Sequence, residues 1–421
     1  MSKEKWIMIG DWVPLQNKGE EAIIRGIEDM YMNVAPSSSV QIGLFDLVDN
    51  YQVKGNIHIF PLKWVYPYYD SFLYKNFNIR KLFLIGKSIC NRLGLHNYSK
   101  NIFSDRYPEL YNFIKSSEIV FVGHDGSFSP FGAGVLSVLQ KHNVNTAIIG
   151  AGFTPNRILI PFIKHYWTSL FLKCKFITLR EERTYKFVKA LVPNKENVLL
   201  APDPAFFFTE ADELPESFKK LNFGVSGNSL VGVTVCENSI VFKEAFRNEG
   251  LGFSAKQEFH AKYIASLLEN LANINKCTFV FLPHCIEEGI GNDIRVAKSV
   301  AMHLRKDSYV ILENDYSVRE MKRILAEFDF VIGERTHSII NSISIGTPFV
   351  AITNTQDKRT HDIVANMCGL NYIINLDYSD VDGHSQFINE TFAARLQIKD
   401  GLAAISTKMR LKLQKVASEL L

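Results

Sequence analysis

An arginine and a histidine stand two positions apart, directly after an apolar run in the C-terminal half of the chain. Residues 328–332 read Phe-Asp-Phe-Val-Ile, and Glu334, Arg335 and His337 follow them. Arginine can hold carboxylate or phosphate oxygens with two parallel hydrogen bonds, and histidine can donate or accept a proton near neutral pH. These residue types at this spacing predict an anion-binding site with a proton donor beside it.

The residues around this pair predict a buried strand followed by a helix. Residues 328–332 are apolar enough to be the strand, and Thr336 is expected to cap the helix. Gly346 is expected to end the helix, because glycine accepts the left-handed conformation, and Pro348 prevents its continuation. The helix face expected to be buried carries Ile339, Ile340 and Ile343.

Arg335 and His337 would then lie at a helix start, where the helix dipole is positive. Two cationic side chains gain nothing from that dipole, whereas Asp or Glu would. One explanation is an anionic ligand. The other is that Glu334 pairs with Arg335 while His337 is neutral and has internal partners. We favour the ligand, since perturbed charges commonly mark functional sites.

Short apolar runs bounded by Gly, Asp, Asn or Pro recur along the chain and predict strands. Amphipathic segments such as 20–30 and 317–328 lie between several of them and predict helices. Continuous apolar strands that alternate with helices are typical of parallel sheets covered on both faces. We therefore expect an α/β fold with two doubly wound, Rossmann-like domains. The predicted strands are at 6–9, 41–45, 57–60, 119–122, 146–149, 176–179, 198–201, 231–235, 278–282, 309–312, 328–332, 349–352 and 372–374.

A polar stretch at 209–228 interrupts this rhythm and predicts a domain boundary. We expect an N-terminal domain at 1–215, a C-terminal domain at 229–385, and a helical segment at 386–421 that folds back on the first domain. Residues 62–106 form an insertion rich in aromatic residues, with eight Lys or Arg against two Asp. This composition suits either peripheral contact with a membrane or a helical insertion with aromatic core residues, and we favour the second.

Glycines and polar residues follow several other predicted strands. Ligands of open parallel sheets bind outside the carboxyl ends of the strands, so these residues are expected to share a cleft. Glycine also lets backbone N–H groups approach a ligand closely. The candidates outside the 334–337 segment are Asp11, Asn17, Gly19, Glu20, Asp125, Gly126, Ser127 and Arg180.

The composition is that of an ordinary globular protein. The chain has 421 residues, 47% hydrophobic and 22% charged, and its net charge of +3 is too small to indicate nucleic acid binding. The six cysteines show no CxxC or zinc spacing, and no Asp-x-Asp or His-x-His pair follows a strand, so no metal is expected. Because neither a signal peptide nor a long apolar segment is evident, the sequence predicts a cytoplasmic protein.

The order of these motifs resembles the polysaccharide pyruvyl transferase family over residues 7–376. The family's Arg-x-His, Gly-x-Pro and following lysine, and its Asn-x-Gly-Asp-Glu-Ala loop, all have counterparts. These counterparts are Arg335-Thr-His337, Gly346-Thr-Pro348, Lys358 and Asn17-Lys-Gly19-Glu20-Glu21-Ala22. The chain departs from the pattern at Glu20, which replaces Asp, at Thr336, which replaces an apolar residue, and at His124-Asp125, which interrupts a run of glycines.

The resemblance implies transfer of pyruvate from phosphoenolpyruvate to two hydroxyls of a sugar, giving a cyclic ketal in the synthesis of an exopolysaccharide, capsule or cell wall. It also implies two domains similar to the GT-B glycosyltransferases, with the site in the cleft between them. Phosphoenolpyruvate is the donor substrate, and no cofactor is expected. The acceptor is a sugar or a polyprenyl-linked oligosaccharide, which is compatible with a location on the inner face of the membrane.

Phosphoenolpyruvate carries about three negative charges when its phosphate is ionised. Arg335, Lys358 and Arg180 are the cations expected to hold it. His337 is expected to protonate the methylene carbon, a step worth about 10²–10⁴-fold, so Arg335 and His337 are the expected catalytic pair. Asn17, Gly19, Gly126, Ser127 and Glu334 are expected to contact substrate, and the base that accepts the hydroxyl protons stays open among Asp11, Glu20 and Asp125.

Two other functions remain as alternatives. A nucleotide-sugar glycosyltransferase of polysaccharide synthesis would use Arg335 and Lys358 to hold a diphosphate. An inactive homologue would bind sugar without chemistry, although a binding module has no need of Arg335, His337 and Lys358 together. Assembly into a homo-oligomer is left open.

Overall fold

A computed structural model describes residues 4–36, 39–46, 55–65, 103, 106–124, 130–152, 161–221, 223, 227–236, 252–287, 291–355 and 357–418. The chain divides into two compact units. The first comprises Met1–Leu15, Ile27–Pro204 and Lys412–Leu421, and the second comprises Gln16–Gly26 and Ala205–Leu411. Relative to the expected boundaries, the short segment Gln16–Gly26 therefore belongs with the C-terminal part of the chain.

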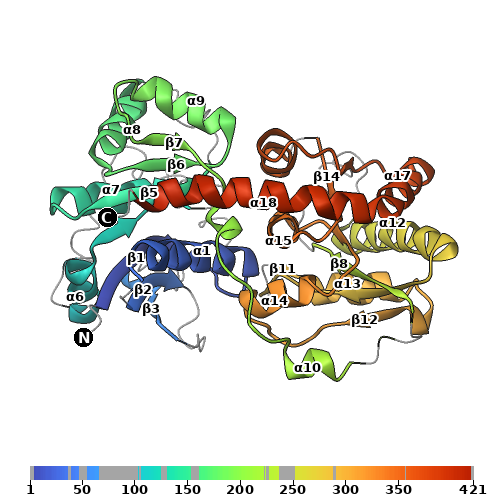
Figure 1. Ribbon diagram of the computed structural model, residues 1–421. Coiled ribbons are helices and arrows are strands. Elements are labelled where there is room, and N and C mark those ends of the chain that lie inside the picture. Colours follow the sequence, from blue (N-terminus) through green and yellow to red (C-terminus); the bar gives the residue numbers. More distant parts are fainter. Residues whose placement is uncertain are drawn as a thin grey trace. The chain divides into compact units, whose positions relative to one another are not determined.

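The first unit is built on a seven-stranded parallel sheet in the order β3-β2-β1-β4-β5-β6-β7 (Figure 1). Each of its strands coincides with one of the first seven predicted apolar runs. The inner strands β4, β5 and β6 are wholly buried, which explains why they read as continuous apolar runs rather than alternating ones, whereas the edge strands β3 and β7 are partly exposed. They are β1 (Glu4–Trp12), β2 (Ser39–Asp46), β3 (Ile57–Pro61), β4 (Ile119–Phe121), β5 (Thr146–Ala151), β6 (Ile177–Leu179) and β7 (Val198–Leu200).

Helices α6, α7 and α8 contribute to one core with the strands of this sheet. Phe113 of α6 lies so close to β2 that a Cβ on Gly43 would be 2.5 Å from its ring. Of the predicted insertion, only 62–65, 103 and 106 are described, and Trp64 stacks on Tyr107 with ring centroids 4.6 Å apart. The first-unit helices include α1 (Lys18–Val34, shared with the second unit), α2 (Leu62–Val65), α6 (Pro108–Ser116), α7 (Pro130–Lys141), α8 (Pro161–Lys173) and α9 (Glu182–Leu191).

The second unit contains a six-stranded parallel sheet in the order β12-β9-β8-β13-β14-β15. All six strands were predicted by the apolar runs. A short antiparallel pair, β10 (Ile286–Glu287) and β11 (Gly291–Asn292), follows the second strand of this sheet. The six strands are β8 (Ser229–Thr234), β9 (Cys277–Phe281), β12 (Tyr309–Ile311), β13 (Phe330–Gly333), β14 (Phe349–Thr353) and β15 (Ile373–Asn375).

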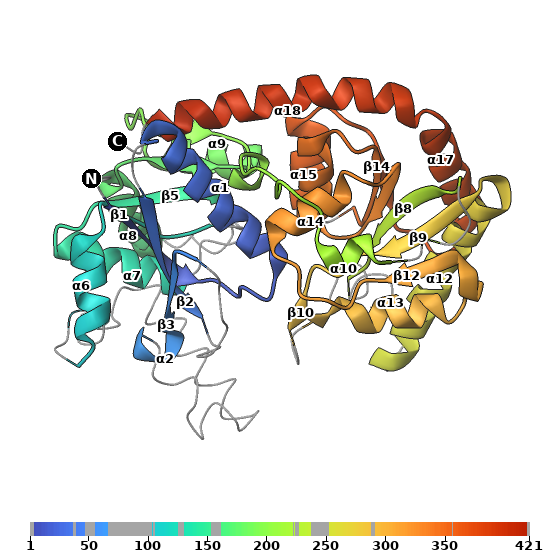
Figure 2. The same ribbon diagram turned by 60° about the horizontal axis from the view of Figure 1, so that its bottom comes forward.

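Helices cover both faces of this second sheet. Figure 2 shows α14 and α15 on one side, and α12 and α13 on the other, where α17 also packs against α12. None of the helices in the described ranges has the length and apolar character needed to cross a membrane. The helices are α10 (Glu216–Lys219), α12 (Phe253–Ile274), α13 (Asp293–Ala301), α14 (Val318–Leu325), α15 (Thr336–Ile345), α16 (Lys358–Thr360), α17 (Val381–Ala393) and α18 (Arg395–Ser418, which from Lys412 on belongs to the first unit), and a π-helical segment spans His361–Met367.

The direction of winding reverses between β8 and β13. From β8 the chain moves outward through β9 and β12, then returns to place β13 on the other side of β8 and continues outward through β14 and β15. Such a switch point opens a crevice at the carboxyl ends of the two central strands, where α/β proteins bind ligands. Glu334 and Arg335 directly follow β13 at this point.

Helix α14 begins with a complete capping box. The Ser317 hydroxyl accepts a hydrogen bond from the Glu320 backbone N–H, and the Glu320 carboxylate accepts one from the Ser317 backbone N–H. We expect Ser317→Ala to lower the unfolding free energy by about 1 kcal/mol, because both helix-start donors lose their geometry. Chemical denaturation measures this, with Ser299→Ala in the exposed part of α13 as the control. Equal effects of the two substitutions would contradict the capping role.

Candidate active site

Three segments of the second unit meet at the switch point: the start of α1, the turn after β9, and the start of α15. Asn17 forms an antiparallel bridge with Cys285, and the Lys18 backbone N–H donates to the His284 carbonyl at 2.8 Å. These backbone bonds fix the N-terminal loop to the turn that follows β9. The tie explains why Gln16–Gly26 belongs to the second unit although the chain enters it from the first sheet.

The start of α1 lies against the ring of His337. The Asn17 side chain accepts a hydrogen bond from the Gly19 backbone N–H at 3.1 Å, as an N-cap does. A Cβ on Gly19 would lie 2.3 Å from Nδ1 of His337, well inside van der Waals contact. The structure thus brings Asn17, Gly19 and His337 together, as the sequence analysis expected. Glycine is required at position 19 because the histidine ring occupies the space of a side chain.

Arg335 is held by Asp293, the first residue of α13. The guanidinium Nε lies 2.9 Å from Oδ2 of Asp293, and the second contact joins the same two side chains at 2.5 Å. Asp293 is fully buried, whereas the Arg335 side chain is 20% exposed. Burial by itself lowers the pKa of the Arg335 guanidinium, but the Asp293 carboxylate more than offsets this, so the pKa is raised. Arg335 therefore stays charged and fixed in orientation.

Asp293 also organises the turn after β9. Its Oδ2 accepts hydrogen bonds from the backbone N–H groups of His284, at 3.1 Å, and Cys285, at 2.9 Å. One carboxylate thus connects the β9 turn to the guanidinium at the start of α15. Because all of these bonds are buried or partly buried, removing the carboxylate would leave several donors without an acceptor.

Glu334 faces away from Arg335. Its Oε1 lies 2.9 Å from Nε2 of His260, and its Oε2 accepts a hydrogen bond from the Cys236 backbone N–H at 3.0 Å. His260 continues the chain of contacts through Nδ1 to the Tyr378 hydroxyl at 2.8 Å. The alternative in which Glu334 pairs with Arg335 is therefore wrong. With its side chain 1% exposed, Glu334 supports the turn, and its expected contact with substrate stays a prediction.

Thr336 does not cap α15, contrary to expectation. The helix begins at Thr336 itself, Arg335 is the N-cap residue without a side-chain cap bond, and the Thr336 hydroxyl lies 2.9 Å from that of Thr360. The helix ends as predicted at Gly346, whose φ is 80°. His337 consequently occupies the first turn, where backbone N–H groups lack intrahelical acceptors.

The first turn of α1 carries further charged groups, which form ion pairs and hydrogen bonds with neighbouring residues. Lys18 Nζ lies 3.2 Å from Oε2 of Glu21 and 2.6 Å from Oδ1 of Asp315. Glu21 also accepts a bond from the Val318 backbone N–H at 3.3 Å. Glu20, a candidate base, is 7% exposed in the same turn.

Two other candidates, Arg180 and Asp11, belong to the first unit. Arg180 is fully buried and pairs with the equally buried Asp203. The expected contact of Arg180 with phosphoenolpyruvate stays a prediction. Asp11 is 7% exposed and accepts a hydrogen bond from the Trp12 backbone N–H at 2.9 Å. Asp125, Gly126, Ser127 and the side chain of Lys358 lie outside the described part of the structure.

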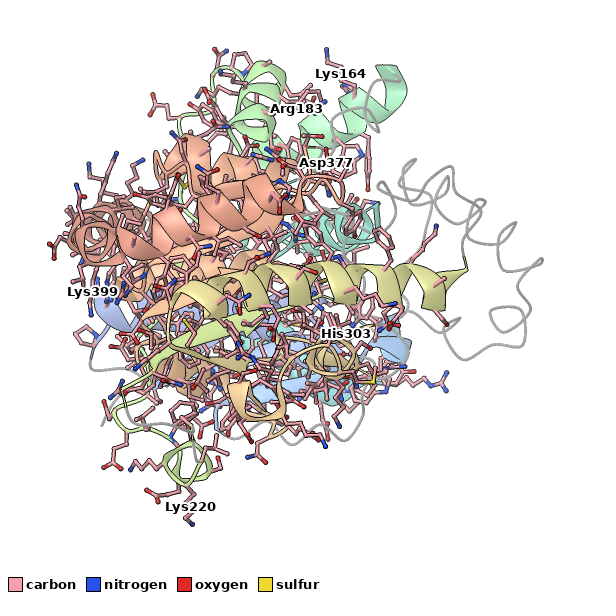
Figure 3. All side chains as sticks on the ribbon, turned by 90° about the vertical axis from the view of Figure 1, so that its right-hand side faces the viewer. Lys164, Arg183, Lys220, His303, Asp377 and Lys399 are labelled. Atoms are coloured by element: carbon pink, nitrogen blue, oxygen red, sulfur yellow. The ribbon has the colours of Figure 1, made fainter. Side chains whose placement is uncertain are left out.

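Cations near His337 differ from those on the surface. Lys164 and Arg183 of the first unit, and Lys220 and Lys399 of the second, carry exposed side chains (Figure 3). Arg335 and Lys18 instead have carboxylate partners. Arg335 pairs with Asp293, and Lys18 pairs with Glu21 and Asp315. Around His337, an anion would therefore meet hydrogen-bond donors with fixed orientations rather than a large excess of positive charge.

Three residues of this region were not predicted from the sequence. His284 is 1% exposed and follows β9, Asp293 begins α13, and Asn341 is fully buried one helical turn beyond His337. Neither side-chain amide atom of Asn341 has a hydrogen-bond partner among the described residues. The signal for His284 was its place after the predicted strand 278–282, the same rule that had identified Arg335. Asp293 and Asn341 carried no comparable signal.

His284 gives the second unit a distinct pH dependence. Burial lowers the pKa of its imidazole from 6.5 to about 4, helped by the nearby charges of Arg335 and His337 and opposed by Asp293. Between pH 7 and pH 5 the unfolded state takes up a proton that the folded state excludes, so stability falls with falling pH. We expect His284→Asn to remove about 2 kcal/mol of this loss. Denaturation of both proteins at the two pH values measures it, and an unchanged pH dependence would contradict the burial of a neutral imidazole.

The two parallel sheets, each with helices packed on it, define an α/β protein of two Rossmann-like units. Solved structures share this architecture along nearly their whole length. Trehalose-6-phosphate synthase OtsA is 12% identical, with 100% of this chain and 99% of that chain covered and a TM-score of 0.56. The S. aureus MnaA–UDP structure is 10% identical (97% and 92% covered, TM-score 0.52), and UDP-GlcNAc 2-epimerase from Neisseria meningitidis bound to UDP-GlcNAc is 12% identical (99% and 98% covered, TM-score 0.50).

At these identities the likeness shows the fold alone, and it confirms the expected glycosyltransferase-like architecture. The sequence pattern of the polysaccharide pyruvyl transferase family matches residues 49–356, more than two thirds of the chain. The protein belongs to the polysaccharide pyruvyl transferase family. The family indicates a transferase that acts on polysaccharide. No curated protein matches the chain in sequence.

Proposed function

We propose that the protein transfers the pyruvyl group of phosphoenolpyruvate to two hydroxyls of a sugar in a polysaccharide precursor, forming a cyclic ketal. Family membership supports a transferase acting on polysaccharide. The observation that supports the specific reaction is that two side chains stand together at the start of α15. Arg335, held by Asp293, is the N-cap residue, and His337 is in the first turn. An oriented cation beside a proton donor is what protonation of an anionic enol ester requires.

Arg335 is suited to hold the donor. Asp293 engages Nε and one terminal nitrogen, and the remaining N–H groups of the guanidinium have no partner among the described residues. Because the side chain is 20% exposed, these donors can reach a carboxylate or phosphate from solvent. The start of α15 adds a positive dipole end. Lys358, at the start of α16, is the second cation that we assign to the donor.

His337 is the group that we assign to proton transfer. A protonated imidazole gives its proton to the methylene carbon of phosphoenolpyruvate, which becomes a methyl group and leaves C2 electrophilic. One sugar hydroxyl then forms a bond to C2, and the carbon–oxygen bond to phosphate breaks. The second hydroxyl then forms a bond to the same carbon, its O–H bond breaks with release of the proton to solvent, and the ring is closed. Gly19 lies against one side of the His337 ring, where a Cβ would be 2.3 Å from Nδ1.

Ligand stabilisation tests the class of donor. Phosphoenolpyruvate at about 100 times its dissociation constant is expected to stabilise the protein by about 2.7 kcal/mol, because only a ligand that prefers the folded state raises the melting temperature. UDP-glucose and UDP-GlcNAc are expected to give no shift. The reverse pattern would favour a nucleotide-sugar glycosyltransferase, and no shift with either would favour an inactive homologue.

The reaction itself is tested in D₂O. With phosphoenolpyruvate and an acceptor drawn from methyl galactoside, methyl mannoside and methyl N-acetylglucosaminide, the ketal methyl group is expected to carry one deuterium. The reason is that the His337 proton exchanges with solvent between turnovers. NMR of the product distinguishes this from enolpyruvyl transfer, which retains a vinylic CH₂. A product with an intact vinylic signal would refute the ketal mechanism.

A further inference from the structure

His284 has a backbone fixed from two sides. Its N–H donates to Oδ2 of Asp293 at 3.1 Å, and its carbonyl accepts from the Lys18 N–H at 2.8 Å. The side chain is therefore carried by the same two segments that position Arg335 and Gly19. Only 1% of His284 is exposed, so its imidazole is shielded from bulk water.

One hydrogen bond of the ring determines its tautomer. Nδ1 lies 3.1 Å from the carbonyl oxygen of Leu282, and a carbonyl can only accept. Nδ1 therefore carries the proton, and in the neutral ring Nε2 presents a lone pair. Burial keeps the ring neutral, since it lowers the imidazole pKa to about 4.

Nε2 of His284 is buried and has no hydrogen-bond partner among the described residues. Leaving a buried acceptor unpaired costs about 1–3 kcal/mol, so such an atom calls for an explanation. Arg335 and His337 are near enough for their charges to disfavour protonation of this ring. The Nε2 lone pair can therefore accept a hydrogen bond from a ligand, close to Arg335 and His337, which we assign to phosphoenolpyruvate.

A substrate group that fills this position must donate a hydrogen bond. Phosphoenolpyruvate with an ionised phosphate offers only acceptor oxygens, whereas a sugar brings hydroxyl donors. We propose that Nε2 of His284 binds the attacking hydroxyl of the acceptor sugar and receives its proton as the new bond forms. This inference rests on the proposed function and supplies a base for it from outside Asp11, Glu20 and Asp125.

The step balances without another reactant. The hydroxyl oxygen forms a bond to C2 of the protonated donor, its O–H bond breaks, and the proton passes to Nε2. The imidazolium then returns the proton to solvent before the next turnover. A weak base is sufficient, because a hydroxyl oxygen that has gained a third bond is strongly acidic. Before that bond forms, the neutral ring only orients the hydroxyl.

Two substitutions at one position separate the nitrogens. Asn can still donate to the Leu282 carbonyl, as Nδ1 does, but places nothing at Nε2, whereas Gln places an amide near Nε2. With saturating phosphoenolpyruvate and the three methyl glycosides, we expect His284→Asn to lower kcat by about 10²-fold or more. The melting-temperature shift from phosphoenolpyruvate should stay at the wild-type value. His284→Gln should recover at least about tenfold of the loss, because it restores an acceptor for the hydroxyl.

The outcomes are distinguishable. Wild-type kcat in His284→Asn, with the wild type forming ketal, overturns this inference and leaves the proposed function intact. Loss of the phosphoenolpyruvate shift in the variant also overturns it, since His284 would then belong to the donor site. If the wild type gives no such shift, the proposed function fails and the inference fails with it. Independently of any variant, ¹⁵N NMR of the wild type should show the Nδ1–H tautomer, and an Nε2–H tautomer would contradict the proposal.

Discussion

Asp293→Ala is expected to lower the unfolding free energy by about 3–5 kcal/mol, as removal of one partner of a buried ion pair does. The substitution leaves the Arg335 guanidinium without its carboxylate, and it removes the acceptor of two backbone N–H groups, those of His284 and Cys285. Chemical denaturation followed by circular dichroism measures the loss. Asp293 joins the turn after β9 to the start of α15, so its removal should also displace Arg335. We therefore expect phosphoenolpyruvate no longer to raise the melting temperature.

Two controls bracket this prediction. Asp293→Asn keeps an oxygen for the backbone donors and loses the charge, so its effect should lie between those of wild type and Asp293→Ala. Glu313→Ala removes one partner of an exposed pair in the same unit, where Lys298 and Glu313 are 53% and 57% exposed, and should change stability by less than about 1 kcal/mol. If Asp293→Ala were as mild as Glu313→Ala, Asp293 would not be the organising carboxylate of the site.

Gly19→Ala is expected to lower turnover by about 10²-fold, the effect of displacing a catalytic group by roughly 1 Å. A Cβ at this position would lie 2.3 Å from Nδ1 and 2.9 Å from Cγ of His337, so the ring has to move. The reaction with phosphoenolpyruvate and the methyl glycosides measures kcat. Binding of phosphoenolpyruvate should be affected less than turnover, because the alanine Cβ would displace His337 and not Arg335.

Gly401→Ala is the matched control for this substitution. Gly401 lies within α18, and a Cβ added there meets no atom within 4 Å. Replacing glycine by alanine in a helix should raise stability by up to about 1 kcal/mol, with turnover unchanged. Wild-type turnover in Gly19→Ala would show that His337 tolerates displacement, and would count against its role as the proton donor.

The sequence by itself determined the strands, because a strand buried on both faces must be apolar along its length. All thirteen predicted runs coincide with strands of the two parallel sheets. The same local pattern located Arg335 and His337 at the junction of β13 and α15, and Gly346 at the end of that helix. These features depend on residues close together in the chain. The arrangement of the predicted domains across a cleft stays a prediction.

Only the tertiary structure decided which partner each charged group takes. Arg335 pairs with Asp293 rather than with its neighbour Glu334, Arg180 is buried with Asp203, and Gly19 packs on His337. Each of these contacts joins residues far apart in the chain, and many carboxylates in the sequence could have satisfied each cation equally well. Charge pairing has no sequence period, in contrast to the burial of strands and helices. The partners are therefore fixed by where the sheets bring the strand ends together, and not by any local pattern.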